Sequence, residues 1–203
     1  MVVPFLITIL LTIFLFSFTA NAGTVQLPQT GQTACYDSAG VVIPCTGTGQ
    51  DGEILAGVAL PSPRFTVSGD CVTDNLSGLM WTKDANVMVS QDPGFDTDGT
   101  AGDGAVNWQH ALDYANGLSL CGYTDWCLPN RKELYSLTDF SRYSPALPSG
   151  HPFLNVQSDG YWLSTTISGT TSKAWLVPMW GGNIYDDFKS QYYGYFVWAV
   201  RAG

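Results

Sequence analysis

Four aspartates in a glycine-rich stretch are the first residues in this sequence whose types and spacing could do chemistry. They are Asp92, Asp96, Asp98 and Asp103. Calcium prefers several oxygen ligands on a flexible backbone, and the segment that begins at Asp96 resembles the start of a calcium loop. Counted from Asp96 as position 1, position 12 is Asn107, where an EF-hand has glutamate. The stretch therefore predicts a calcium site without the full EF-hand pattern, and the alternative is a solvated acidic loop.

A second candidate site surrounds Trp180, near the C-terminus. Two glycines follow this tryptophan, and a segment rich in aromatic and hydrogen-bonding side chains comes next. The candidate ligand-binding residues are Trp180, Asn183, Tyr185, Asp186, Asp187, Tyr192 and Tyr193. Sugar recognition needs a flat apolar face for the C–H groups of the ring and planar polar groups for its hydroxyls. The segment predicts a carbohydrate-binding surface, or else a turn packed by its own aromatic side chains.

Signatures of catalysis are missing. The sequence contains neither the G-x-S-x-G nucleophile elbow nor the H-E-x-x-H zinc motif. Its two histidines, His110 and His151, have no recognisable ligand spacing, and we interpret them as capped or surface side chains. These observations favour a protein that is not an enzyme.

The amino-acid composition limits the classes of partner that the chain can bind. The chain has 203 residues, with 8 Lys+Arg against 17 Asp+Glu and a formal net charge of −9. Non-specific nucleic-acid binding is excluded on this basis, because phosphate contacts need clustered lysine and arginine. Aromatic residues make up 13%, which argues against a disordered chain. Charged residues make up only 12%, so we expect short strands and ordered loops rather than long surface helices.

Two helices are expected to position these candidate sites. The first begins after Asn107, a typical N-cap residue. Its apolar face has the helical spacing and consists of Trp108, Ala111, Leu112 and Ala115. The second begins at Asn130, and Glu133 lies three residues on, which approximates a capping box. Its expected core residues are Leu134 and Leu137.

Strands dominate the remaining pattern. The expected strands are 65–67, 71–74, 79–83, 161–166, 174–177 and 195–201, and Gly181-Gly182 could turn a hairpin. Six tryptophans are expected in the core: Trp81, Trp108, Trp126, Trp162, Trp175 and Trp198. Two helices followed by a run of antiparallel strands indicate the α+β class.

The N-terminal third divides into two segments. Residues 1–22 combine an apolar run with an Ala-x-Ala pattern, which predicts a secretory signal peptide cut before Gly23. No basic residue precedes the run, so a retained anchor is the alternative. The run is too short for a membrane span, and we expect none after signal removal. We interpret residues 23–63 as a polar arm and residues 64–203 as the main domain. We expect the protein to be secreted, periplasmic or at the cell surface.

Five cysteines follow the predicted signal, and export permits disulfides. Because five is odd, at least one stays unpaired or pairs with another chain. A hairpin closed by Cys35 and Cys45 is the economical interpretation of the arm. Cys71–Cys121 is the preferred second pair and Cys121–Cys127 the competing one, with Cys127 expected to face the core.

Several blocks of the sequence resemble the Lcl C-terminal domain family, named for a bacterial collagen-like adhesin. These blocks are Thr73–Trp81, Gly122–Leu134, Tyr161–Thr166, Ala174-Trp175 and Val197–Arg201, and the resemblance spans about residues 64–203. It departs from the family at Cys127, where arginine is usual, and at Ala199, where proline is usual.

The resemblance implies a C-type-lectin-like fold in the group that includes the formylglycine-generating enzymes. It also implies an exported adhesin-type module, and it supports the Cys71–Cys121 pair. The founding domain is associated with sulfated polysaccharides, but a net charge of −9 argues against polyanionic ligands.

Two functions of different classes follow. The first is a secreted recognition module for a surface glycan or a protein ligand. The second is a structural subunit of an extracellular assembly, which self-associates by adding a strand from residues 23–63 to the sheet edge of a neighbour.

Overall fold

The computed structural model describes residues 27–94, 102–191 and 194–203. The predicted signal peptide at 1–22 lies outside these ranges. The helices are α1 (Asp51–Ile54), α2 (Met88–Gln91), α3 (Trp108–Gly117) and α4 (Arg131–Ser136). The strands are β1 (Cys35–Tyr36), β2 (Val42–Ile43), β3 (Phe65–Ser68), β4 (Cys71–Asp74), β5 (Met80–Thr82), β6 (Gly160–Thr166), β7 (Lys173–Pro178), β8 (Tyr185–Phe188) and β9 (Val200–Arg201). The mixture of helices and antiparallel sheets agrees with the α+β expectation.

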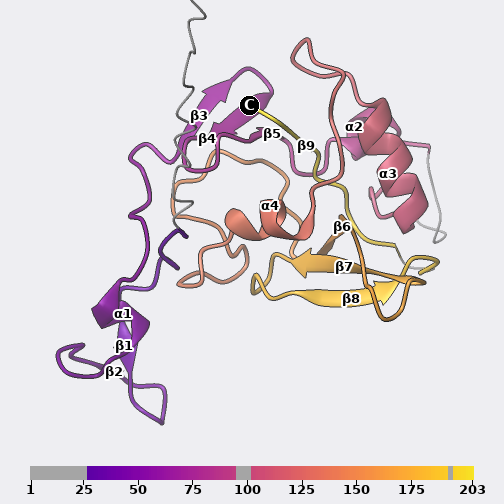
Figure 1. Ribbon diagram of the computed structural model, residues 1–203. Coiled ribbons are helices and arrows are strands. Elements are labelled where there is room, and N and C mark those ends of the chain that lie inside the picture. Colours follow the sequence, from indigo (N-terminus) through magenta and orange to yellow (C-terminus); the bar gives the residue numbers. More distant parts are fainter. Residues whose placement is uncertain (1–26, 95–101, 192–193) are drawn as a thin grey trace, which may run out of the picture.

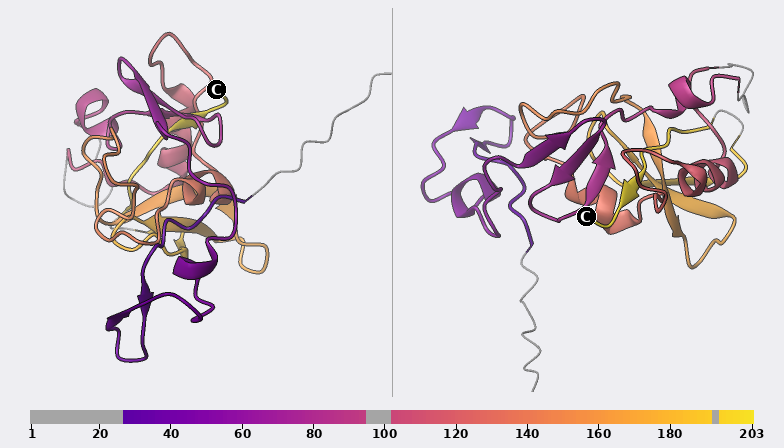
Figure 2. Two further views of the ribbon diagram at one scale, coloured as in Figure 1. Left: turned by 90° about the vertical axis from the view of Figure 1, so that its left-hand side faces the viewer. Right: turned by 90° about the horizontal axis from the view of Figure 1, so that it is seen from above.

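Three antiparallel sheets organise the chain. A four-stranded sheet has the order β3-β4-β5-β9, a three-stranded sheet has the order β6-β7-β8, and β1 pairs with β2 in the arm. Figure 1 shows α4 lying between the two larger sheets and α3 beside them. The arm, with α1, β1 and β2, projects from one end of the domain (Figures 1 and 2).

Both expected helix starts are confirmed. The Asn107 side chain accepts a hydrogen bond from the backbone N–H of His110 and so caps α3. At α4, the Asn130 side chain accepts from the N–H of Glu133, while the Glu133 carboxylate accepts from the N–H of Asn130. This reciprocal pair is the capping box that the sequence indicated.

The elements differ from the expected ones in two details. The one-turn helices α1 and α2 were not expected, because four residues are too few to show an apolar period. The run 195–201 is not one strand: Tyr195 bridges Val106, Phe196 bridges Tyr161, and only 200–201 joins the four-stranded sheet. The chain changes partners along this run, so each bridge is short.

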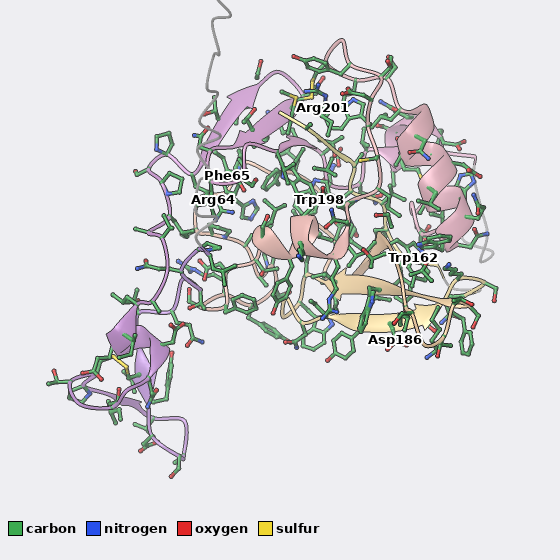
Figure 3. All side chains as sticks on the ribbon, viewed as in Figure 1. Arg64, Phe65, Trp162, Asp186, Trp198 and Arg201 are labelled. Carbon is green, nitrogen blue, oxygen red and sulfur yellow. A yellow bond between two sulfur atoms is a disulfide. The ribbon has the colours of Figure 1, made fainter. Side chains whose placement is uncertain are left out.

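The two faces of the three-stranded sheet contact different cores. Along β6, Trp162 packs with the cluster that includes α3, whereas Tyr161 and Leu163 pack with the cluster around Trp198. Trp198 lies in the middle of the domain (Figure 3), with its ring centroid 4.7 Å from Phe153 and 5.8 Å from Trp81. The β6 strand therefore joins both cores.

Four of the six tryptophans expected in the core are fully buried: Trp81, Trp126, Trp162 and Trp198. The other two, Trp108 and Trp175, are only partly buried, and a cation lies over each ring. Lys189 Nζ lies 3.9 Å from the centroid of Trp108, and the Arg131 guanidinium lies 4.2 Å from that of Trp175. These rings form the boundary of the core.

The cysteines form two disulfides, Cys35–Cys45 in the arm and Cys71–Cys121 in the domain. The expectation that Cys127 faces the core was wrong, since this residue is exposed while its neighbours Trp126 and Leu128 are buried. Successive side chains point to opposite sides of the backbone in this segment. Cys127 forms a backbone bridge with Val200, and its side chain points away from the core.

The free thiol leads to a prediction. Partial burial, and then the carboxylates of Glu133 and Asp125, raise the pKa of Cys127 above its ordinary value. Since the thiolate is the nucleophile, we expect iodoacetamide to label Cys127 more slowly than free cysteine at pH 7.5, with a rate that rises as the pH increases. Mass spectrometry of the time course measures this, with Cys127→Ser as the unlabelled control. Labelling as fast as free cysteine would contradict the raised pKa.

Candidate functional site

The candidate site lies on the face of the three-stranded sheet that is turned away from α4. Leu176 and Pro178 of β7 point to this face, and Tyr185 lies opposite Leu176 in the register of β7 and β8. Together with Asp159, Trp180, Asp186 and Tyr195, they line a groove of about 330 Å³. We call this the aromatic groove.

Backbone hydrogen bonds to two separate segments hold Trp180 at the end of the groove. Its N–H donates to the carbonyl of Ser158 at 2.8 Å, and its carbonyl accepts from the N–H of Ser144 at 3.1 Å. The indole remains 36% exposed despite this fixed backbone. Its position is therefore defined while its face stays available to a ligand.

Trp180 is the central member of a row of exposed rings. Its ring centroid lies 6.1 Å from that of Tyr143 and 6.1 Å from that of Tyr185. Tyr143 is 73% exposed and Tyr185 46% exposed. We call these three residues the aromatic row. The row continues the groove outward onto the surface.

The Asp187 carboxylate holds the hydroxyl of Tyr195, which lines the groove. The Tyr195 hydroxyl and the Gln191 amide donate to the same Asp187 oxygen, at 2.8 Å and 2.9 Å. Burial, and then the hydrogen bond to Asp187, raise the pKa of Tyr195 to about 12. The phenol therefore stays protonated at physiological pH, and this contact fixes its ring against Trp162.

The opposite face of the sheet is occupied by cations. Lys173 donates to the Asp186 carboxylate at 2.8 Å and lies over the Phe188 ring at 4.8 Å. Figure 3 shows Asp186 on the outer strand β8. Asp186 therefore lies at the border of the groove, and its carboxylate already forms an ion pair with Lys173. No lysine or arginine is among the described residues that line the groove.

The structure brings together only some of the ligand-binding residues expected from the sequence. Trp180, Tyr185 and Asp186 line the groove, and Asp187 accepts a hydrogen bond from the lining residue Tyr195. Asn183 is exposed in the turn between β7 and β8 and does not line the groove. Tyr192 and Tyr193 lie outside the described residues.

Besides the apolar Leu176 and Pro178, the sequence analysis missed three aromatic or acidic residues of the groove and row: Tyr143, Asp159 and Tyr195. Tyr195 belonged to an expected strand, and period-two alternation could have placed it on the face of Trp162. Tyr143 sits in an irregular segment that reaches Trp180 only through tertiary hydrogen bonds, so no local pattern could have identified it.

The expected calcium residues are found in separate surroundings. Asp92 lies 3.8 Å from His110, while Asp103 accepts from the N–H of Ala105 at 2.8 Å. Asp96 and Asp98 lie outside the described residues. Within the described ranges, no group of three or more His, Cys, Asp or Glu side chains is arranged to hold a metal ion.

Comparison with known families gives one match. The profile of the Lcl C-terminal domain matches residues 70–201, which is more than half of the chain. The chain belongs to the Lcl C-terminal domain family. A search of curated proteins finds no match.

The Lcl C-terminal domain match covers the two larger sheets except for β3, together with α2, α3 and α4 and the whole aromatic groove. The arm at 27–63 lies before the match. Its two-stranded sheet is joined to the domain by the N–H of Phe140, which donates to the carbonyl of Thr30, and by the Gln32 amide, which donates to the carbonyl of Phe140. In the part of the chain that the structure describes, no helix is both long and apolar enough to cross a membrane.

The turn after β7 gives a second prediction. Gly182 has a φ of +67°, and a Cβ there would lie 3.1 Å from Cβ of Ala146. We expect Gly182→Ala to lower the free energy of unfolding by about 1–2 kcal/mol, because a side chain is strained in the left-handed region. Urea denaturation measures the change. Gly169→Ala is the matched control, since nothing lies within 4 Å of its Cβ position. Equal stability of the two variants would contradict the prediction.

Proposed function

We propose that this Lcl C-terminal domain is an exported recognition module that binds neutral carbohydrate in the aromatic groove. The observation that carries the proposal is the row of three exposed rings beside a groove with an exposed carboxylate, Asp159. Aromatic faces cover the C–H surface of a sugar, and carboxylate oxygens accept hydrogen bonds from its hydroxyls. The absence of cations from the described groove lining favours a neutral ligand over a sulfated one.

A binding role, rather than catalysis, is part of the proposal. The described lining of the groove contains no histidine, cysteine, serine or threonine. It offers ring faces and hydrogen-bond acceptors instead of a nucleophile beside a base. Secretion or display at the cell surface fits the two disulfides, which form in oxidising compartments.

We also infer that the domain has the C-type-lectin-like arrangement expected from its family. Two capped helices, α3 and α4, lie beside antiparallel sheets, and a disulfide ties β4 to the turn after α3. These features support the assignment.

The test is a glycan array with the protein lacking residues 1–22, in calcium and in a chelator. The proposal expects binding to neutral oligosaccharides and none to sulfated ones. The chelator arm tests the calcium prediction, which depends in part on Asp96 and Asp98. Absence of binding to every neutral glycan in both conditions would overturn the proposal.

The arm supports a second candidate function, a structural subunit in an extracellular assembly. Val41 and Val42 at the β1–β2 hairpin are 58% and 66% exposed, and Ile54 of α1 is 59% exposed. Strand edges with exposed apolar side chains can pair with another chain. Sedimentation of the wild type and of Val42→Asp tests this. A wild type that stays monomeric at all concentrations would remove the candidate.

A further inference from the structure

The rings of the aromatic row are not coplanar. The planes of Tyr143 and Trp180 meet at 62°, and those of Trp180 and Tyr185 meet at 41°. A polymeric ligand that contacts more than one of these rings must therefore present apolar faces that point in different directions along its chain. The row is a twisted platform rather than a flat one.

The fold fixes the backbone that carries each ring. Ser144, next to Tyr143, donates to the carbonyl of Trp180, and two residues further on the Ala146 N–H donates to the carbonyl of Met179 at 2.8 Å. Tyr185 begins β8 and is fixed in register opposite Leu176. Each ring is therefore attached to backbone that is hydrogen-bonded to another part of the domain, and these bonds fix the points from which the three rings project.

Polysaccharides differ in how their rings follow one another. In cellulose and chitin, successive sugars present their faces in one plane, and crystals of these polymers expose flat surfaces. In xylan and in β-1,3-glucan the chain is helical, so that successive faces point in different directions. The centroid spacing of 6.1 Å on both sides of Trp180 is comparable with the distance between neighbouring sugars in such chains.

We propose that the aromatic row selects soluble, helically twisted neutral polysaccharides and rejects the flat surfaces of crystalline ones. This inference rests on the proposed function and narrows its ligand class. Trp180 makes the central contact, because it packs against both tyrosines. Tyr143 and Tyr185 contact the sugars on either side, and the Asp159 carboxylate accepts a hydroxyl hydrogen bond within the groove.

The experiment compares two measurements on the wild-type protein lacking residues 1–22. Affinity electrophoresis in gels containing soluble xylan or β-1,3-glucan reports binding to twisted chains, and depletion by crystalline cellulose or chitin reports binding to flat ones. We expect retardation in at least one soluble gel and no depletion by either crystalline polymer. Tyr143→Ala should weaken the retardation severalfold.

Phe188→Ala is the matched control, since this ring is 51% exposed on the opposite face of β8. It should leave the retardation unchanged. Depletion by crystalline cellulose or chitin at least as strong as the binding to soluble chains would overturn the inference and leave the proposed function standing. No binding to any of the four polymers would overturn the inference, whereas the proposed function falls only if the glycan array also shows no binding to neutral glycans.

Discussion

Replacing Asp74 by alanine is expected to lower the free energy of unfolding by about 3–5 kcal/mol. Asp74 is fully buried, and its two oxygens accept from Nε and Nη2 of Arg64 at 2.6 Å and 3.0 Å. The same carboxylate also accepts from the N–H of Leu76 and the hydroxyl of Ser77. Removing it leaves the buried guanidinium without its counter-charge.

This ion pair links distant parts of the domain. Arg64 also donates to the carbonyl of Ser136 at the end of α4, and Figure 3 shows its position beside Phe65 at the start of β3. The expected loss is a large share of the roughly 5–15 kcal/mol that stabilises a typical domain. Urea denaturation measures it.

Asp125→Ala is the control for the loss of an ion pair as such. Asp125 bonds Arg201 at 2.7 Å on the surface, where water can replace the carboxylate, so its loss should matter far less. A loss at Asp74 no larger than that at Asp125 would show that burial does not make the first pair important.

The second large effect is expected from the domain disulfide. Cys71–Cys121 closes a loop with a sequence separation of 50, and the chain-entropy relation gives a stabilisation of about 4 kcal/mol for such a loop. We expect the Cys71→Ala, Cys121→Ala double variant to unfold at a much lower temperature than the wild type. Differential scanning calorimetry measures this.

Removing the arm disulfide with Cys35→Ala and Cys45→Ala is the comparison. This bond has a sequence separation of 10 and joins β1 to the segment after β2, away from both core clusters. The main transition of the domain should therefore change little. Equal shifts from the two double variants would contradict this assignment of the disulfides to separate units.

The sequence predicted features that depend on neighbouring residues. Asn107, Asn130 and Glu133 cap helices through bonds that span three residues or fewer, so their side chains alone indicate where α3 and α4 begin. Alternation also located most of β6 and β7. Because these elements position the groove, the secondary structure around the site was predictable from the sequence.

Features that depend on distant contacts were not predictable in the same way. Tyr143 joins the aromatic row because the segment after α4 is hydrogen-bonded to the backbone of Trp180. Cys127 faces outward because its bridge to Val200 leaves Trp126 and Leu128 on the core side. In both cases a contact across the fold decides which way the side chain points.

Asn183 lies away from the groove for a related reason. A composition rich in aromatic and amide groups indicates sugar binding but does not specify which side chains share a face. The register between β7 and β8 places Tyr185 toward the groove, while Asn183 stays in the turn. The register is fixed by the pairing of the two strands, which composition does not report.

The most direct test of the account is the affinity of Trp180→Ala for the neutral glycan that the wild type binds best on the array. Isothermal titration calorimetry of the wild type, Trp180→Ala and Phe188→Ala gives the three dissociation constants. The account predicts that Trp180→Ala binds at least about tenfold more weakly, as expected for a central aromatic anchor, while Phe188→Ala binds like the wild type. Wild-type affinity in Trp180→Ala would contradict the claim that the aromatic groove is the binding site.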